Sequence, residues 1–212
     1  MSKEALIILP GITATPEKQA FVESYLRAHT DYEVLLPRLW QNLGIRGAAR
    51  QLQKFMDRHS GYERVHFLTY ISGGFILRDM LCRRPLPHIG RLVHVRGPIQ
   101  EQVPGLVIKQ HGRIAAFMIK GLMMFDLSAP WRNEIPFAAT PLAQGLVIEK
   151  GVSKLAAELG LKAEDFDRLR NAPEFKIPPA DDTWLAEESH DEVYTSEPLL
   201  GRMANFFATG KF

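Results

Sequence analysis

The stretch VHFLTYISGGFIL, residues 65–77, gives the strongest structural signal in the chain. Residues 65–69 form a short apolar run rich in strand-forming side chains, and residues 73–81 have the apolar spacing of an amphipathic helix. Few residues separate the two, and the adjoining glycines allow a tight turn. A strand that passes directly into a helix in this way is typical of a parallel sheet covered by helices.

The turn fits the pattern small-x-nucleophile-x-small in two alignments. In the first, Thr69 and Gly73 are the small residues and Ile71 occupies the nucleophile position. In the second, Ser72 is the nucleophile and Tyr70 occupies a small position. The first is favoured because a tyrosine ring does not fit where the turn has little room. Isoleucine has no heteroatom, so it can neither attack a carbonyl nor pass a proton.

With an apolar run at residues 5–9 followed by Pro10-Gly11-Ile12, this turn resembles the short bacterial α/β-hydrolases of the lipase/esterase type. In that family the turn usually reads Thr-His-Ser-Leu-Gly-Gly, and residues 69–74 read Thr-Tyr-Ile-Ser-Gly-Gly. The family's first strand leads into a His-Gly loop that supplies an oxyanion-hole N–H. Pro10 replaces that histidine. The resemblance implies an oxyanion hole or cleft at Gly11, Ile12, Tyr70 and Gly73.

The C-terminal region extends the resemblance. Ser189-His190, an apolar helical pattern at residues 199–207 and the ending Gly210-Lys211-Phe212 match the end of the family's sequences, which places His190 at the catalytic-base position. The family's acidic residue follows the penultimate strand, and the nearest match after residues 145–148 is Asp165, within a helical pattern at residues 152–169. From the residues alone, His190 is equally a loop histidine among acids, and Asp165 a solvated helix residue.

Strand and helix patterns alternate along all 212 residues, of which 46% are hydrophobic and 24% charged. The sequence therefore predicts one α/β domain, residues 1–212, with a mostly parallel sheet and helices on both faces. Residues 100–141 are expected to form a small helical cap. Its segment 112–125 has too many apolar residues for one helix face, which favours a buried cap helix and, as the second interpretation, a homodimer contact.

Other features narrow the class of protein. No apolar run is long enough to span a membrane, no leader is recognisable, and the single Cys82 forms no internal disulfide, so a cytoplasmic location is expected. Residues 1–120 hold 17 basic and 9 acidic residues. Because the basic residues are not interleaved with aromatic ones and form no known nucleic-acid-binding motif, no nucleic-acid binding is predicted. The sequence has neither a dinucleotide nor a phosphate-binding motif, and its seven histidines lack metal spacing. We expect no cofactor and no metal.

Two functions remain. The first is a hydrolase-like protein without serine-hydrolase activity, which binds a small apolar or ester-like ligand or a protein partner in the former active-site cleft. The second is an active carboxylic-ester hydrolase that uses Ser72 with His190, or a water activated by His190. The replacements at Ile71 and Pro10 favour the first, and the retained histidine favours the second.

Overall fold

The computed structural model describes residues 3–137, 140–176 and 179–212. Its centre is a six-stranded sheet in the order β2-β1-β3-β4-β5-β6, and every neighbouring pair is parallel. The strands are β1 (Glu4–Leu9), β2 (Glu33–Leu35), β3 (Arg64–Tyr70), β4 (Ile89–Arg96), β5 (Ala143–Gly151) and β6 (Asp182–Ser189). The predicted α/β class with a parallel sheet is confirmed.

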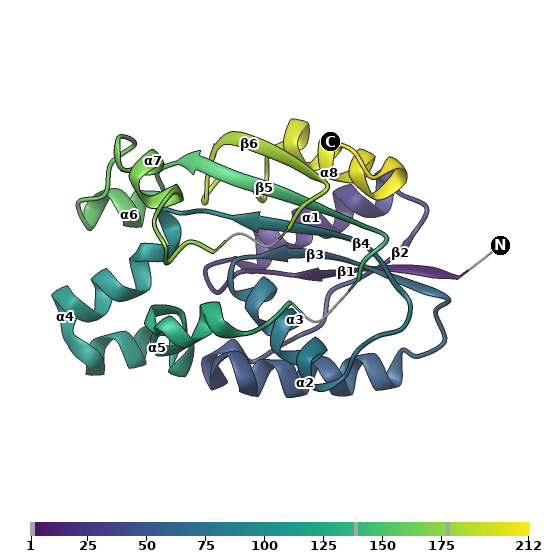
Figure 1. Ribbon diagram of the computed structural model, residues 1–212, viewed down its shortest axis with the longest axis horizontal. Helices are drawn as coiled ribbons and strands as arrows, with labels where there is room; N and C mark the ends of the chain where they lie inside the picture. Colours follow the sequence, from purple (N-terminus) through teal and green to yellow (C-terminus); the bar gives the residue numbers. More distant parts are fainter. Residues whose placement is uncertain (1–2, 138–139, 177–178) are drawn as a thin grey trace.

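Helices cover both faces of the sheet (Figure 1). The helix α1 (Pro16–His29) and the helix α8 (Glu197–Thr209) pack on one face, and α2 (Gly44–Arg58) and α3 (Ser72–Arg83) pack on the other. The side chains of β1 alternate accordingly: Ile7 and Leu9 join the core under α2 and α3, while Leu6 and Ile8 join the core under α1 and α8. The period of two along each strand therefore builds two separate cores.

The chain between β4 and β5 forms the segment where a cap is expected. It contains α4 (Val103–Lys120) and α5 (Leu122–Ser128), with the short 3-10 helices η2 (Gln100–Gln102) and η3 (Pro130–Glu134) at its ends. Gly112, at φ 82°, breaks α4 into two helical pieces. Residues 138–139 of the predicted cap lie outside the described residues. In Figure 1 these helices lie at the carboxyl ends of the strands, which is the ligand-binding edge of a parallel sheet.

The region with a helical pattern, residues 152–169, is not one continuous helix in the structure. Two short helices occur there, α6 (Lys154–Glu158) and α7 (Asp165–Arg170), and Gly160 lies between them at φ 87°. That conformation ends a helix, and glycine adopts it without a side-chain clash. The remaining 3-10 helix, η1 (Gln41–Leu43), precedes α2.

Candidate functional site

Ile71 lies at the apex of the turn between β3 and α3. It has φ 30° and ψ −90° and is the one non-glycine residue at positive φ in the described parts of the chain. A β-branched residue at positive φ is strained, by on the order of 1–2 kcal/mol. The turn thus has the backbone of a nucleophile elbow with an isoleucine at its apex.

Contacts on two sides hold this turn in place. The Ile71 N–H donates to the Val95 carbonyl at the end of β4, at 3.0 Å. On the other side Gly73 packs so closely on β1 that a Cβ at this position would lie 2.2 Å from the Leu9 carbonyl oxygen. The surrounding backbone therefore imposes the strained geometry, as expected where strain persists in a folded chain.

His190 follows β6 and is almost fully buried, at 4% exposed. Its Nδ1 lies 3.0 and 3.1 Å from the two carboxylate oxygens of Glu149, near the end of β5. Its Nε2 lies 3.0 Å from the Thr13 hydroxyl. Because a carboxylate only accepts, Nδ1 carries the proton in the bond to Glu149, and Nε2 accepts from Thr13. The result is a carboxylate-imidazole-hydroxyl chain in which the hydroxyl belongs to Thr13.

The structure places Glu149, and not Asp165, beside His190. Asp165 begins α7, where its carboxylate accepts from the Lys162 N–H at 3.0 Å and pairs with Arg168 at 2.6 Å. These bonds hold the pKa of Asp165 below its usual range, the Arg168 bond being the larger cause. Asp165 therefore makes only local contacts in the first turn of α7, whereas Glu149, near the carboxyl end of β5, contacts the histidine.

Removing the Glu149 side chain by Glu149→Ala is expected to lower the free energy of unfolding by about 2–3 kcal/mol, because the buried Nδ1–H of His190 loses its acceptor. Asp165→Ala is the matched control and should leave the midpoint of urea unfolding close to that of the unmodified chain. The measurement is urea unfolding followed by circular dichroism. Equal midpoints for the two variants would contradict the assignment of Glu149.

The loop after β1 approaches the histidine from the opposite side. The Gly11 N–H donates to the Tyr194 hydroxyl at 3.0 Å, so this N–H is already bonded, although Gly11 itself lines the cavity. Tyr70 is fully buried and stacks on Tyr194 with ring centroids 4.1 Å apart. Burial raises the pKa of both tyrosines above the usual range. Tyr70 is therefore a core residue beneath the site, whereas Ile12 lines the cleft.

Ser72, the first residue of α3, joins this loop to the elbow. Its hydroxyl donates to Gln41 Oε1 at 2.8 Å, and the Gln41 amide donates to the Pro10 carbonyl at 2.8 Å. Among the described residues Ser72 makes no hydrogen bond with His190. Its position one residue past the apex explains this, because its side chain points along the helix start toward η1.

A cavity of about 250 Å³ lies between the elbow, His190 and the cap. This volume lies just below the usual range of about 300–1,000 Å³ for ligand pockets. The wall contains Ile71, Thr13 and His190, and most of it consists of apolar side chains from the loop after β1 and from the cap and its surroundings: Ile12, Val103, Pro104, Val107, Ile119, Met124, Leu127 and Leu155.

The buried charges in the cavity wall are paired. Glu101 forms a buried ion pair with Arg96, and the Arg132 guanidinium lies 3.6 Å from the same carboxylate. Burial lowers the pKa of Arg132, and Glu101 partly opposes that shift. Two guanidinium groups share this one carboxylate, and the rest of the wall is mostly apolar, so the cavity interior favours an apolar ligand group.

Thr13 and Glu149 are site residues that the sequence analysis did not single out. Glu149 follows the apolar residues 146–148 directly, and an acid at the carboxyl end of a buried strand was the available signal. Thr13 gave no signal, because its contact with His190 joins residues 177 positions apart.

The described residues contain no group of three or more His, Cys, Asp or Glu side chains that could hold a metal ion. None of the helices in residues 3–137, 140–176 and 179–212 is both long and apolar enough to cross a membrane.

Comparison with solved structures identifies the fold. Neither known family models nor curated proteins match the chain. The structure is similar to a metagenome-derived lipolytic enzyme, with TM-score 0.64, 13% identity and coverage of 98% of this chain and 94% of the other. It is also similar to the Bacillus licheniformis lipase BlEst2, with TM-score 0.63, 11% identity and coverage of 100% and 93%. The thioesterase RedJ of the prodiginine biosynthetic pathway in Streptomyces coelicolor matches with TM-score 0.52, 11% identity and coverage of 96% and 85%.

These similarities, with the parallel sheet and the elbow between β3 and α3, define an α/β-hydrolase fold. These three neighbours, two lipolytic enzymes and a thioesterase, share the fold with this chain over nearly its whole length.

Proposed function

We propose that this chain binds a small apolar or ester-like ligand in the cleft above the elbow and does not act as a serine hydrolase. The supporting observation is Ile71: it holds the strained apex position and lines the cavity, but it has no atom that could attack a carbonyl. His190 supports the proposal as well, because its Nε2 is bonded to Thr13 and meets no serine hydroxyl among the described residues.

A fluorophosphonate probe tests the absence of a serine nucleophile. The unmodified chain should not be labelled, and Ile71→Ser should be labelled, because it places a hydroxyl at the apex of an otherwise retained elbow. The double variant Ile71→Ser/Thr13→Val should label faster, since Thr13 no longer occupies Nε2 of His190. Adding His190→Ala to the Ile71→Ser variant should abolish labelling. Labelling of the unmodified chain that disappears in Ser72→Ala would contradict the proposal.

Ligand binding is tested separately with methyl octanoate as the probe. At a hundred times its dissociation constant it should stabilise the chain by about 2.7 kcal/mol in thermal unfolding. Val107→Phe enlarges a side chain of the cavity wall and should remove most of this stabilisation. Equal stabilisation of the unmodified chain and of Val107→Phe by the ligand would show that it binds outside this cavity.

The second candidate function is ester hydrolysis, and the Glu149-His190 pair is the observation that favours it. An imidazole oriented by a carboxylate is the arrangement of a general base, and Nε2 faces the cavity beside Thr13. In this function Nε2 would accept a proton from a water, or from Ser72 after the serine leaves Gln41. Turnover of p-nitrophenyl esters that is lost in His190→Ala would favour this candidate over simple binding.

A further inference from the structure

The outer side of the cap carries a group of apolar side chains that nothing covers. We call it the cap patch, and it consists of Ile114 (83% exposed), Met118 (79%), Ile119 (54%), Phe117 (50%) and Leu122 (48%). Exposed apolar residues scattered singly are ordinary, whereas a contiguous set marks an interaction surface.

The cap patch follows from the orientation of the second half of α4. Residues 114, 117 and 118 recur at helical spacing and share one face of this helix, and Leu122 follows at the start of α5. That face is exposed, while the small Ala116 is fully buried on the inner side. A helix of a globular protein normally buries its large apolar side chains. This helix instead turns its large apolar side chains to the solvent and a small alanine to the interior.

A second exposed apolar group continues the surface. Trp40 is 70% exposed and Leu43 is 48% exposed at the two ends of η1. A groove lined by both Trp40 and Lys120 connects them with the cap, and Leu122 lies beside Gly44 at the start of α2. The apolar surface therefore runs from the cap across to η1.

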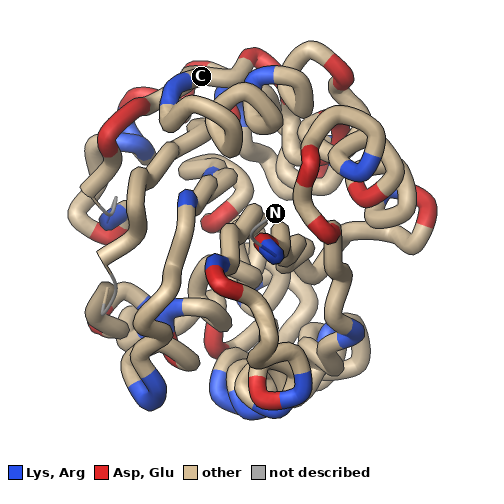
Figure 2. The backbone as a smooth tube through the Cα atoms, turned by 90° about the vertical axis from the view of Figure 1, so that its right-hand side faces the viewer, with Lys and Arg blue, Asp and Glu red and all other residues tan. Residues whose placement is uncertain are grey.

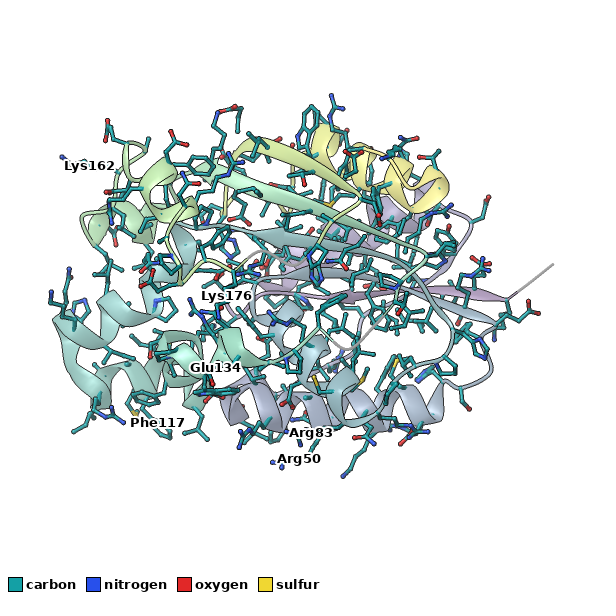
Figure 3. All side chains as sticks on the ribbon, viewed as in Figure 1. Arg50, Arg83, Phe117, Glu134, Lys162 and Lys176 are labelled. Carbon is teal, nitrogen blue, oxygen red and sulfur yellow. The ribbon has the colours of Figure 1, made fainter. Side chains whose placement is uncertain are left out.

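Cations surround this apolar surface, and acids are absent from the chain segments that form it. Residues 102–125 contain Lys109, Arg113 and Lys120 and no Asp or Glu, and residues 34–56, which include Arg46 and Arg50, also contain none. Within the described parts of the chain none of these five cations has an ion-pair partner. Figure 3 shows Phe117 and Arg50 projecting from the same lower edge of the molecule. Figure 2, seen from the end opposite the cap, shows both basic and acidic residues along the lower edge.

The nearest acid in sequence does not neutralise the surface. Asp126 follows residues 102–125, but its carboxylate turns inward and accepts from the Ile45 N–H at 2.7 Å. Burial raises the pKa of this carboxyl. The charge of Arg46 partly opposes this shift, so the other four cations supply the uncompensated positive charge among the apolar side chains.

We propose that this surface docks on an anionic membrane, with the cap patch in the headgroup region and the cations against acidic lipid headgroups. Apolar side chains flanked by Lys and Arg are what a peripheral membrane surface requires, and an exposed tryptophan suits the interface. A second copy of this chain is a less suitable partner for the surface. A two-fold dimer would place the same cations face to face with no acid to pair them.

The docking surface lies directly next to the cavity. Ile119 and Lys120 belong both to this surface and to the cavity wall. A chain docked through the cap patch would therefore hold the cavity next to the lipid, from which an apolar ligand could enter without crossing water. The docking itself does not depend on what the cavity binds.

Vesicle sedimentation tests the proposal with the full chain. Vesicles of phosphatidylglycerol should bind the chain at least tenfold more tightly than vesicles of phosphatidylcholine, and 0.5 M salt should reduce that difference. Ile114→Glu/Met118→Glu should abolish sedimentation. Lys109→Gln/Arg113→Gln/Lys120→Gln should reduce binding to phosphatidylglycerol at least tenfold and leave the apolar side chains intact.

The matched control is Leu142→Glu, because Leu142 is 57% exposed and precedes β5 at the opposite end of the sheet. It should bind vesicles like the unmodified chain, and circular dichroism should show that all variants are folded. Equal binding to both lipids, no binding to either, or a dimer that Ile114→Glu/Met118→Glu dissociates would each overturn the proposal.

Discussion

Replacing Gly73 with alanine is expected to lower the free energy of unfolding by about 3 kcal/mol or more, because an added methyl group would collide with backbone. The new Cβ would lie 2.2 Å from the Leu9 carbonyl oxygen and 2.8 Å from its carbonyl carbon. Neither atom can move without shifting β1, which is paired with β2 and β3 on its two sides. Urea unfolding followed by circular dichroism measures the loss.

Gly105→Ala is the control for this substitution. Gly105 lies in α4, and no atom would lie within 4 Å of its added Cβ. Alanine has a higher helix propensity than glycine, so this variant should be stabilised by about 0.5–1 kcal/mol. If Gly73→Ala unfolded at the same urea concentration as Gly105→Ala, α3 would not pack as closely on β1 at Gly73 as the structure shows.

The tight contact at Gly73 also explains how the site is assembled. It fixes the start of α3 against the end of β1, so the elbow and the following loop meet at one edge of the sheet. The hydrogen bonds from Ser72 to Gln41 and from Gln41 to Pro10 then connect the same two segments. Ser72, considered from the sequence as a nucleophile, has in the structure a connecting role.

The sequence predicted the architecture because strand and turn patterns are local. The apolar runs and the glycine-rich turn at residues 69–74 indicated parallel strands followed by helices, and every neighbouring pair of strands is parallel. The helical pattern over residues 152–169 did not show that the region divides into two helices at Gly160. Apolar spacing gives the face that a helix buries, but it does not show where one residue adopts positive φ.

The site was harder to predict because its contacts join distant parts of the chain. The resemblance of the C-terminal region predicted His190. The acidic residue that contacts this histidine could not be identified from sequence spacing alone. Asp165 matched a sequence neighbourhood, but the histidine is met by Glu149, 41 positions away, because β5 and β6 are adjacent in the sheet. The Thr13 contact depends on the loop after β1 crossing the cleft, which no local pattern records.

Acid is expected to destabilise this chain through His94, the buried histidine behind the elbow. His94 is 2% exposed, its Nδ1 lies 2.7 Å from the Thr69 hydroxyl, and its Nε2 has no partner among the described residues. Burial, with the nearby Arg96 and Arg78, lowers its pKa to about 3. The folded chain therefore keeps this imidazole neutral in a pH range where the unfolded chain protonates it.

The direction of the effect follows from proton linkage. Because the pKa in the folded chain is below the unfolded value of about 6.5, the stabilisation is complete above pH 6.5 and falls as the pH decreases toward 3. The loss approaches about 1.4 kcal/mol per pH unit, or about 2–3 kcal/mol between pH 6.5 and pH 4.5. His94→Asn keeps a polar group near Thr69 but does not titrate, so its free energy of unfolding should decline less over this range by about that amount. Carboxylates and other histidines contribute equally to the pH dependence of the unmodified chain and of His94→Asn. If the free energies of unfolding of the two proteins changed in parallel with pH, His94 would be protonated in the folded chain.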